Sequence, residues 1–172
     1  METSQLVISK KLWKKLVIDL KKRGYGKRES GAFLLGPKGT TRITEFICMD
    51  DLDPNCLDTG IIRFSGKGFP PLWKHCKQRD LKVHADVHTH PESWTGMSGA
   101  DKQHPMIAQA GHIGLIIPSY AGNKNQLLNG VGIYRYLGDK KWEFFTGTDT
   151  VFKIKTYGTI RGYLQSFMEL FD

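Results

Sequence analysis

Apolar residues recur at helical spacing near the start of the chain. They are Leu12, Trp13, Leu16, Val17 and Leu20, with lysines at most of the positions between them. Such a stripe is typical of an amphipathic helix with one buried face. Ser9 directly precedes the pattern, and serine is a preferred helix N-cap residue. The pattern therefore predicts a helix that Ser9 caps and that runs to about Arg23.

Short apolar runs bounded by glycine, proline and polar clusters predict most of the strands. The predicted strands cover residues 31–35, 41–49, 82–90, 112–118, 131–137 and 141–145. We expect the first two to pair with each other and the last two to form a hairpin. Residues 50–60 and 91–100 are predicted loops, and residues 64–69 a strand end followed by a turn.

Helical patterns return over residues 70–79, 102–110 and 158–171. The first of these helices is expected to bury Leu72, Trp73 and Cys76. Helices and strands thus alternate unevenly along the chain. This order predicts an α/β fold, a single domain over residues 1–172 with a mixed β-sheet flanked by helices.

Composition narrows the class of protein. The chain has 172 residues, of which 40% are hydrophobic and 24% charged, as in globular domains that bury a core. No apolar stretch reaches the roughly 18 residues of a membrane-spanning helix, and residues 1–15 lack the apolar core of a signal peptide. We expect a cytoplasmic protein without a membrane partner. The odd cysteine count, with no C-x-x-C spacing, predicts that Cys48, Cys56 and Cys76 are reduced structural thiols.

Charge adds a basic bias. Lysine and arginine total 25 against 17 acidic residues, a net charge of +8, which suits an acidic partner or a polyanion. Many of the basic residues fall in the first predicted helix, where a solvated face is the expected reading. Nucleic-acid binding is not expected, because no aromatic residues interleave with the basic ones.

The segment around His88 and His90 carries the candidate chemistry. Side chains two positions apart on a strand point to the same face, about 6.6 Å apart along it, so two imidazoles can share one metal ion. Pro91 favours an extended backbone at His90. Asp101 follows His90 after ten intervening residues and can supply a third ligand. Two histidines and one carboxylate leave a fourth tetrahedral position open, as in catalytic zinc sites, where a bound water has a pKa near neutrality.

Ser98 and Glu29 are the candidate catalytic partners. Ser98 stands three residues before Asp101, so its hydroxyl can assist at the metal, cap a helix, or do both. The pattern H-x-H-x7-S-x-x-D is expected to occur by chance about once in a thousand or more chains of this length and composition. Glu29, just before the predicted strand 31–35, is the candidate general base. Spacing alone leaves three other glutamates open, namely Glu45, Glu92 and Glu143.

Asp86 and His84 precede the histidine pair on the same strand. Alternation predicts that both share the face of His88. Asp86 is expected either to orient a ligand imidazole through a hydrogen bond or to be a buried structural carboxylate. We expect a structural role for His84, as for His75, His104 and His112.

Together these motifs resemble the JAMM (MPN-plus/JAB) zinc metalloprotease family. The matching elements are Glu29 before a strand that ends at Gly36, His88-x-His90-Pro91, and Ser98-x-x-Asp101 seven residues further on. The resemblance implies the JAMM/MPN fold, which is cytidine-deaminase-like. It also implies that His88, His90 and Asp101 hold Zn²⁺, that Glu29 transfers the proton, and that Ser98 stabilises the oxyanion.

The resemblance also implies a substrate. The family cuts after the C-terminal tail of ubiquitin-like proteins, so the implied partner is a ubiquitin-like protein or its conjugate. The H-T-H-P motif with Asp86 two positions ahead is similar to bacterial members, some of which serve antiphage systems. Oligomeric state stays open.

Other functions fit parts of the pattern. A non-catalytic MPN scaffold would share the fold, and a peptidase for a small sulfur-carrier-like precursor would share the chemistry. Two histidines and a carboxylate also describe the facial triad of non-haem iron oxygenases. Zinc nucleobase deamination is disfavoured, since the chain lacks P-C-x-x-C.

Overall fold

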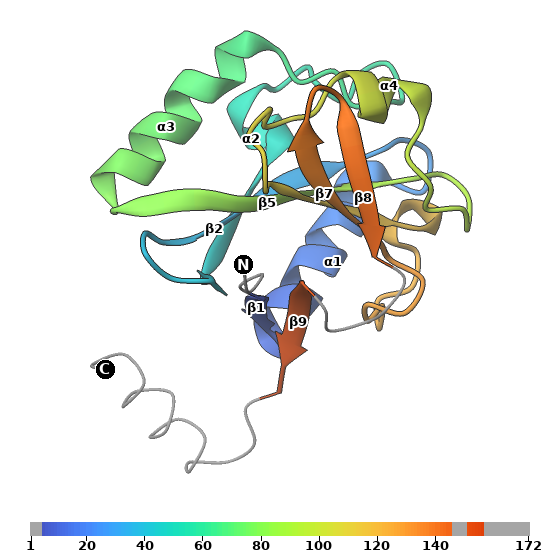
Figure 1. Ribbon diagram of the computed structural model, residues 1–172. Coiled ribbons are helices and arrows are strands. Elements are labelled where there is room, and N and C mark those ends of the chain that lie inside the picture. The colour runs from blue at the N-terminus through green and yellow to red at the C-terminus, as the bar shows by residue number, and fades with distance from the viewer. Residues whose placement is uncertain (1–4, 146–150, 157–172) are drawn as a thin grey trace.

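A six-stranded mixed β-sheet lies at the centre of the fold, with strand order β4-β2-β5-β6-β7-β8 (Figure 1). The computed structural model describes residues 5–145 and 151–156. The strands are β2 (Gly31–Pro37), β4 (Glu45–Cys48), β5 (Leu81–Thr89), β6 (Ile113–Ile117), β7 (Gly132–Gly138) and β8 (Lys141–Phe145). Within this sheet β5 and β6 pair in parallel, and every other neighbouring pair is antiparallel.

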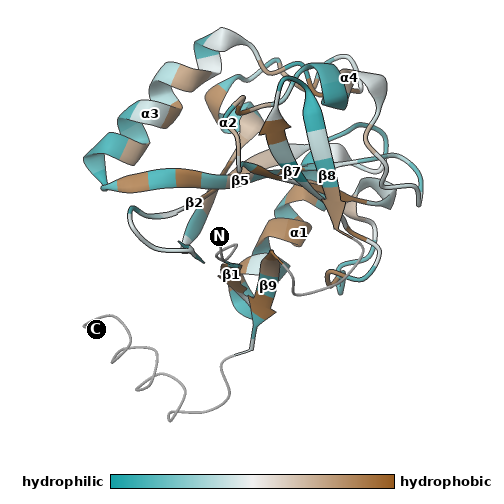
Figure 2. Ribbon diagram, viewed as in Figure 1, coloured by the Kyte–Doolittle hydropathy of each residue, from teal (hydrophilic) through white to brown (hydrophobic). Residues whose placement is uncertain are grey.

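Helices cover both faces of this sheet (Figure 1). Helix α1 (Lys10–Gly24) packs on one face in a core with Ala32, Leu34, Ala85 and Val87. On the other face α2 (Met49–Leu52) and α3 (Phe69–Gln78) pack against Phe33 and Leu35. Figure 2 shows the hydrophobic residues on the central strands and on α1. The predicted mixed sheet flanked by helices is confirmed.

The first helix forms as the sequence predicts. The Ser9 side chain accepts a hydrogen bond from the backbone N–H of Leu12 at 3.2 Å, so Ser9 is the N-cap. Trp13, Leu16, Val17 and Leu20 are buried. Tyr25 ends the helix in the left-handed conformation, with a φ of 52°.

A second sheet contains two strands that the sequence reading missed. Its order is β3 (Arg42–Ile43), β1 (Leu6–Ser9) and β9 (Phe152–Lys155), all parallel. The single strand predicted over residues 41–49 is therefore wrong. Residues 42–43 form β3, which pairs with β1 in the second sheet. Residues 45–48 form β4, which pairs with β2 in the main sheet as expected.

Several local predictions are also wrong. Trp73 is 46% exposed and stacks on Phe69, because α3 buries only a narrow stripe of Leu72 and Cys76. Residues 64–69 contain the 3₁₀-helix η1 (Gly66–Gly68) rather than a strand end, and the loop predicted over residues 50–60 begins inside α2.

The helix predicted over residues 102–110 is also wrong. Helix α4 (Gly99–Gln103) begins earlier and ends before Pro105, whose ring opposes an α-helical conformation at the preceding residue. The terminal helix predicted over residues 158–171 lies outside the described residues.

The three cysteines are buried and unpaired with one another, as predicted. Burial raises the pKa of Cys48 and of Cys56 to about 12, so these thiols stay protonated at neutral pH. Within the described ranges, none of the helices has the length and apolar character that crossing a bilayer requires.

Candidate metal centre

Strand β5 ends by bringing His88 and His90 together. Both side chains are buried, and their Nε2 atoms lie 3.2 Å apart. The ring centroids are 5.0 Å apart and the ring planes are inclined at 53°. Alternation along the strand places both rings on one face, as the spacing predicts. The two imidazoles therefore present their Nε2 atoms to one common point.

Asp101 completes a group of three donors. Its Oδ1 lies 3.4 Å from Nε2 of His88, and its Oδ2 lies 3.4 Å from Nε2 of His90. Ligands 2.0–2.1 Å from a tetrahedral zinc ion are separated by about 3.3–3.4 Å. The distance between the two Nε2 atoms, and the distance from each of them to the nearer Asp101 oxygen, are close to that edge length, and one donor atom from each of the three residues lies within 4.8 Å of the other two. The residues present thus fit a metal ion with two nitrogen ligands and one oxygen ligand.

Helix α4 holds the Asp101 carboxylate in place. Ser98 caps the helix, since its Oγ accepts the backbone N–H of Asp101 at 3.1 Å. In return Oδ2 of Asp101 accepts the backbone N–H of Ser98 at 2.7 Å, which closes a capping box. Two reciprocal hydrogen bonds therefore fix both the carboxylate and the serine hydroxyl beside the histidines.

The electrostatics of the group favour an anionic Asp101. Burial acts to raise the pKa of Asp101, but hydrogen bonds with His88 and His90 outweigh it and hold that pKa far below its usual range. Burial likewise lowers the pKa of His88, and the hydrogen bond and charge of Asp101 reverse this into a net increase. The charges of Asp86 and Glu29 add to that increase. The site is a buried cluster of negative potential, which suits a divalent cation.

Glu29 lies at the start of β2, next to the end of β5. The two chains are joined there by hydrogen bonds between Ser30 and Thr89, from Ser30 N–H to Oγ1 at 3.0 Å and from Thr89 N–H to the Ser30 carbonyl at 2.9 Å. Gly31 is the register partner of His88. The Oε2 atom of Glu29 accepts the backbone N–H of Ile62 at 3.2 Å. Its other carboxylate oxygen has no hydrogen bond among the described residues.

Gly31 permits this close approach. A Cβ atom at this position would lie 2.7 Å from Sδ of Met49, 2.9 Å from Cδ1 of Ile62 and 2.9 Å from the carbonyl oxygen of Val87. Any side chain would push β2 away from β5. The missing side chain therefore sets how close Glu29 comes to the histidine pair.

Two of the other candidate glutamates are engaged elsewhere. Glu45 of β4 pairs with His75 and Arg79 at the end of α3, and Glu143 of β8 pairs with Arg135 of β7. Glu29, by contrast, stands two residues before the register partner of His88, and its charge acts on His88. Its role as general base stays a prediction, as do the roles of Ser98 and the three donors.

Of the two roles expected for Asp86, the hydrogen bonds of the structure favour the buried structural carboxylate. Its Oδ1 lies 2.6 Å from Nε2 of His112, and both side chains are buried. Asp86 also lines a cavity of about 30 Å³ together with His88 and Asp101, and Tyr134 and Trp142 lie in the same lining. The hydrogen bond that the structure describes for Asp86 is therefore structural, and its influence on His88 is electrostatic.

His84 does not share the face of His88. The β2–β5 register skips one residue between the pairs Leu34–Ala85 and Leu35–Val83, so His84 sits in a β-bulge. Across this bulge the alternation resets, since Val83 packs in the α3 core and Ala85 in the α1 core. The prediction that His84 lies on the face of the ligands is wrong for this reason.

Two further contacts at the site were not predicted from the sequence. The exposed indole of Trp94 stacks on the ring of His90, with centroids 5.8 Å apart and planes 28° apart. The 3₁₀ turn η2 (Ser119–Ala121) has three successive non-glycine residues with positive φ. Its Tyr120 N–H donates to the carbonyl of His90 at 2.8 Å. Such strained backbone occurs near functional sites when the surrounding contacts impose it.

Comparison with known proteins adds a shared fold. No protein-family model matches the chain. A solution structure of a protein from Desulfitobacterium hafniense is similar at TM-score 0.59 and 13% identity, covering 88% of this chain and 95% of that one. A protein from Salinibacter ruber is similar at TM-score 0.53 and 12% identity, with coverages of 81% and 88%. These two likenesses show a common fold.

A JAB1/MPN domain protein from Archaeoglobus fulgidus is also among the similar structures. Its TM-score is 0.46 and its identity 15%, over 90% of this chain and 98% of that one.

Proposed function

We propose that the chain is a zinc-dependent peptidase or isopeptidase of the JAMM type. The observation that carries the proposal is the convergence of His88, His90 and Asp101, which offer one donor atom each within 4.8 Å of one another. These residues would hold the ion and leave one tetrahedral position open. Glu29, two residues before the adjacent strand β2, supplies the carboxylate that is not a ligand.

In this proposal Glu29 transfers the proton and Ser98 stabilises the oxyanion. Bound zinc lowers the pKa of water and polarises a carbonyl. Glu29 accepts a proton from the attacking water and returns it to the leaving amine, with the Ile62 N–H holding one carboxylate oxygen and the other taking the proton. The Ser98 oxygen accepts the Asp101 N–H, so its O–H hydrogen can donate to the oxygen that becomes negative during attack.

The proposed substrate is the bond after the C-terminal tail of a ubiquitin-like protein or its conjugate. What supports it is the H-T-H-P motif with Glu29 and Asp86, which resembles bacterial isopeptidases of this family. The net charge of +8 would speed encounter with an acidic carrier at low salt. We place the activity in the cytoplasm and, by the same resemblance, in a bacterial antiphage system.

A direct assay tests the proposal. Zinc-loaded full-length protein is incubated with ubiquitin-like fusions that end in Gly-Gly before a folded reporter or a lysine side chain. Cleavage after Gly-Gly is expected, and Glu29→Gln should reduce it by about a thousandfold or more while zinc stays bound. Zinc content is measured on the same samples.

The outcomes separate the alternatives. Undiminished cleavage by Glu29→Gln would remove Glu29 from the mechanism. Cleavage of short peptides after Gly-Gly, without cleavage of a lysine conjugate, would favour a precursor peptidase. Oxygen consumption by the iron-loaded protein would favour an oxygenase. No activity with either metal would favour a scaffold.

A further inference from the structure

The second sheet turns a basic face outward. Alternation directs Ile8, Ile43 and Ile154 into the core, so the residues between them face away from it. In the register of the sheet, Val7 of β1 lies between Arg42 of β3 and Lys153 of β9. Lys155 follows on the same face, opposite Ser9.

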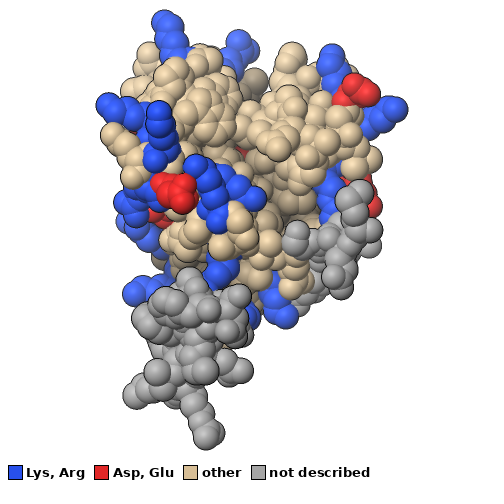
Figure 3. All heavy atoms as spheres, turned by 60° about the vertical axis from the view of Figure 1, so that its left-hand side comes forward, with Lys and Arg blue, Asp and Glu red and all other residues tan. Residues whose placement is uncertain are grey.

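Helix α1 adds lysines to this face. The helix begins directly after β1, and Lys10, Lys11 and Lys14 are all exposed. No acidic residue stands in the first turn of α1. On the face of the molecule in Figure 3, lysine and arginine side chains are likewise widespread and acidic ones are few.

Between this face of β1 and β3 and the start of α1 lies a hollow of about 710 Å³. We call it the basic hollow. Its lining consists of Val7, Ser9, Lys10, Lys11, Leu12, Lys14, Arg42, Ile43, Thr44 and Thr156. Four of these side chains are cationic, and no described residue of the lining is acidic. Apolar groups of Val7 and Leu12, which are partly exposed, lie among the cations, so the hollow offers both charge and apolar surface.

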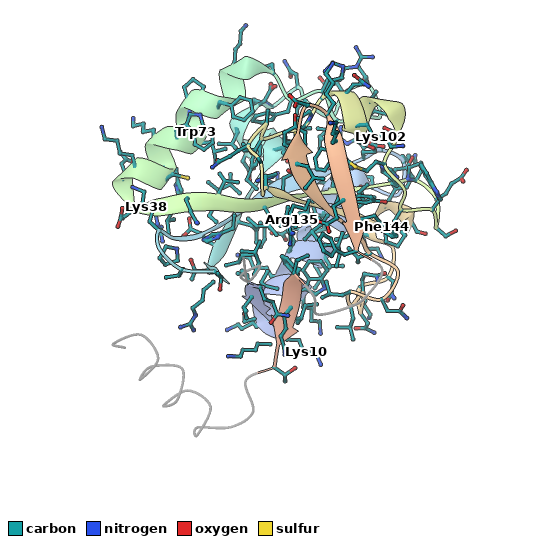
Figure 4. The ribbon with its side chains drawn as sticks, in the orientation of Figure 1. Lys10, Lys38, Trp73, Lys102, Arg135 and Phe144 are labelled. Atoms are coloured by element: carbon teal, nitrogen blue, oxygen red, sulfur yellow. The ribbon has the colours of Figure 1, made fainter. Side chains whose placement is uncertain are left out.

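The basic hollow lies far from the candidate metal centre. In Figure 4, Lys10 is beside β1 and β9 at the bottom of the molecule, and Lys102 of α4 is at the upper right. Asp101 precedes Lys102 in α4, at the metal centre. A ligand in the hollow would therefore leave the metal centre open.

We propose that the basic hollow is a docking site for an acidic polypeptide segment that also carries apolar side chains. Cations around the lining match carboxylates, and the partly exposed Val7 and Leu12 match an apolar anchor. A nucleic acid fits less well, because the described lining has no aromatic side chain on which a base could stack. The inference does not depend on hydrolysis at the metal centre.

A binding experiment on the metal-free full chain tests this docking site. The probe is a short fluorescein-labelled peptide of glutamates with leucines among them, followed by fluorescence anisotropy. A peptide with serine in place of leucine has the same charge and no apolar anchor. An oligothymidylate of equal charge represents nucleic acid.

A matched pair of variants locates the binding. Lys10→Glu with Lys11→Glu reverses two charges in the hollow, and acids in the first turn of a helix are favourable, so this variant should fold. Lys74→Glu with Lys124→Glu makes the same charge change at exposed positions outside the lining. We expect the first variant to weaken binding of the leucine peptide by about tenfold or more, and the second by less than about threefold.

The other occupants appear as outcomes that overturn the inference. Equal weakening by both variants would mean that only the net charge attracts the probe. Binding of the serine peptide as tight as that of the leucine peptide would remove the apolar anchor. Tighter binding of oligothymidylate would make the hollow a nucleic-acid surface. A self-association in sedimentation that Lys10→Glu with Lys11→Glu abolishes would make a second copy of the chain the occupant.

Discussion

Strand β5 and the residue directly after it carry three buried histidines, and the surroundings of these histidines differ between the two ends of the segment. His84, His88 and His90 are 7%, 9% and 5% exposed, so burial does not distinguish them. At the first end Nε2 of His84 has no hydrogen-bond partner among the described residues, and burial, with the charge of Lys82, lowers its pKa to about 4. At the other end the Asp101 carboxylate lies within 3.4 Å of both rings.

The comparison teaches what marks a candidate metal centre in this fold. A buried histidine alone becomes a neutral structural residue, because desolvation opposes its charge. A pair of histidines with a carboxylate fixed by its own capping box becomes a cluster that a cation can enter. The difference comes from α4, which reaches one end of β5 and not the other.

The largest expected effect is on the stabilisation by zinc, and it distinguishes a His→Gln substitution at His88 from the same substitution at His84. His88→Gln should abolish the stabilisation by zinc, and His84→Gln should retain it. Zinc at about a thousand times its Kd stabilises a folded protein by about 4 kcal/mol, which is about 10 °C in Tm for a chain of this size. Scanning calorimetry with and without zinc measures both variants. A zinc-induced shift that survives in His88→Gln would contradict the assignment of this ligand.

The next effect is a pH dependence of stability at the His84 end. The folded-state pKa of His84, about 4, lies below the ordinary value of 6.5. Its contribution to stability is therefore present above pH 6.5 and is lost as the pH falls toward 4, by up to about 3 kcal/mol. Urea unfolding of the metal-free protein at about pH 7 and about pH 4.5 measures the loss.

His84→Gln is the control for this pH dependence. Glutamine does not titrate, so the variant should lose less stability than the natural chain over the same interval. Equal losses in the two proteins would show that His84 is not the group responsible.

A smaller effect separates two roles of Ser98 at the metal end. Ser98→Ala removes the cap of α4 and should lower the free energy of unfolding of the metal-free protein by about 1 kcal/mol. Ser98→Asp keeps a capping acceptor but has no hydroxyl to donate. We expect Ser98→Asp to recover much of the stability in urea unfolding without recovering cleavage. Recovery of both would limit Ser98 to the capping role.

The smallest effect concerns the stacking on His90. Trp94→Ala removes the indole from the His90 ring and should weaken zinc affinity by about twofold to tenfold, because such ring contacts contribute about 0.5–1.5 kcal/mol. Trp73→Ala removes a stacked, half-exposed tryptophan from α3, far along the chain from the ligands. Competition with a chromophoric chelator measures zinc affinity, and an equal loss in Trp73→Ala would show that the effect is not specific to His90.

The sequence predicts those parts of the molecule that local rules govern. The stripe on α1, the strand alternation at His88 and His90, and the S-x-x-D spacing at Ser98 each depend on residues a few positions apart, and each is found in the structure. The His84 bulge is different, because it depends on how β2 meets β5 and leaves no mark on the alternation of β5 itself. The pairing of Asp86 with His112, 26 residues apart, likewise requires the β5–β6 register.

Short elements escape prediction for a related reason. Strands β1 and β9 have four residues each, and they are strands because they pair with each other across most of the chain. The partner, rather than the local pattern, specifies them. Trp94 is different, because it follows His90 by only four positions but lies in a loop, where no regular periodicity indicates which neighbour a side chain contacts.

The capping box of α4 has a consequence for how the protein handles its ion. Asp101 is tied to Ser98 by the polypeptide's own backbone, so its position does not wait for a cation to organise it. The Asp101 carboxylate therefore needs little further ordering when a metal ion binds. A chelated sample should therefore reload on mixing, without passing through an unfolded chain.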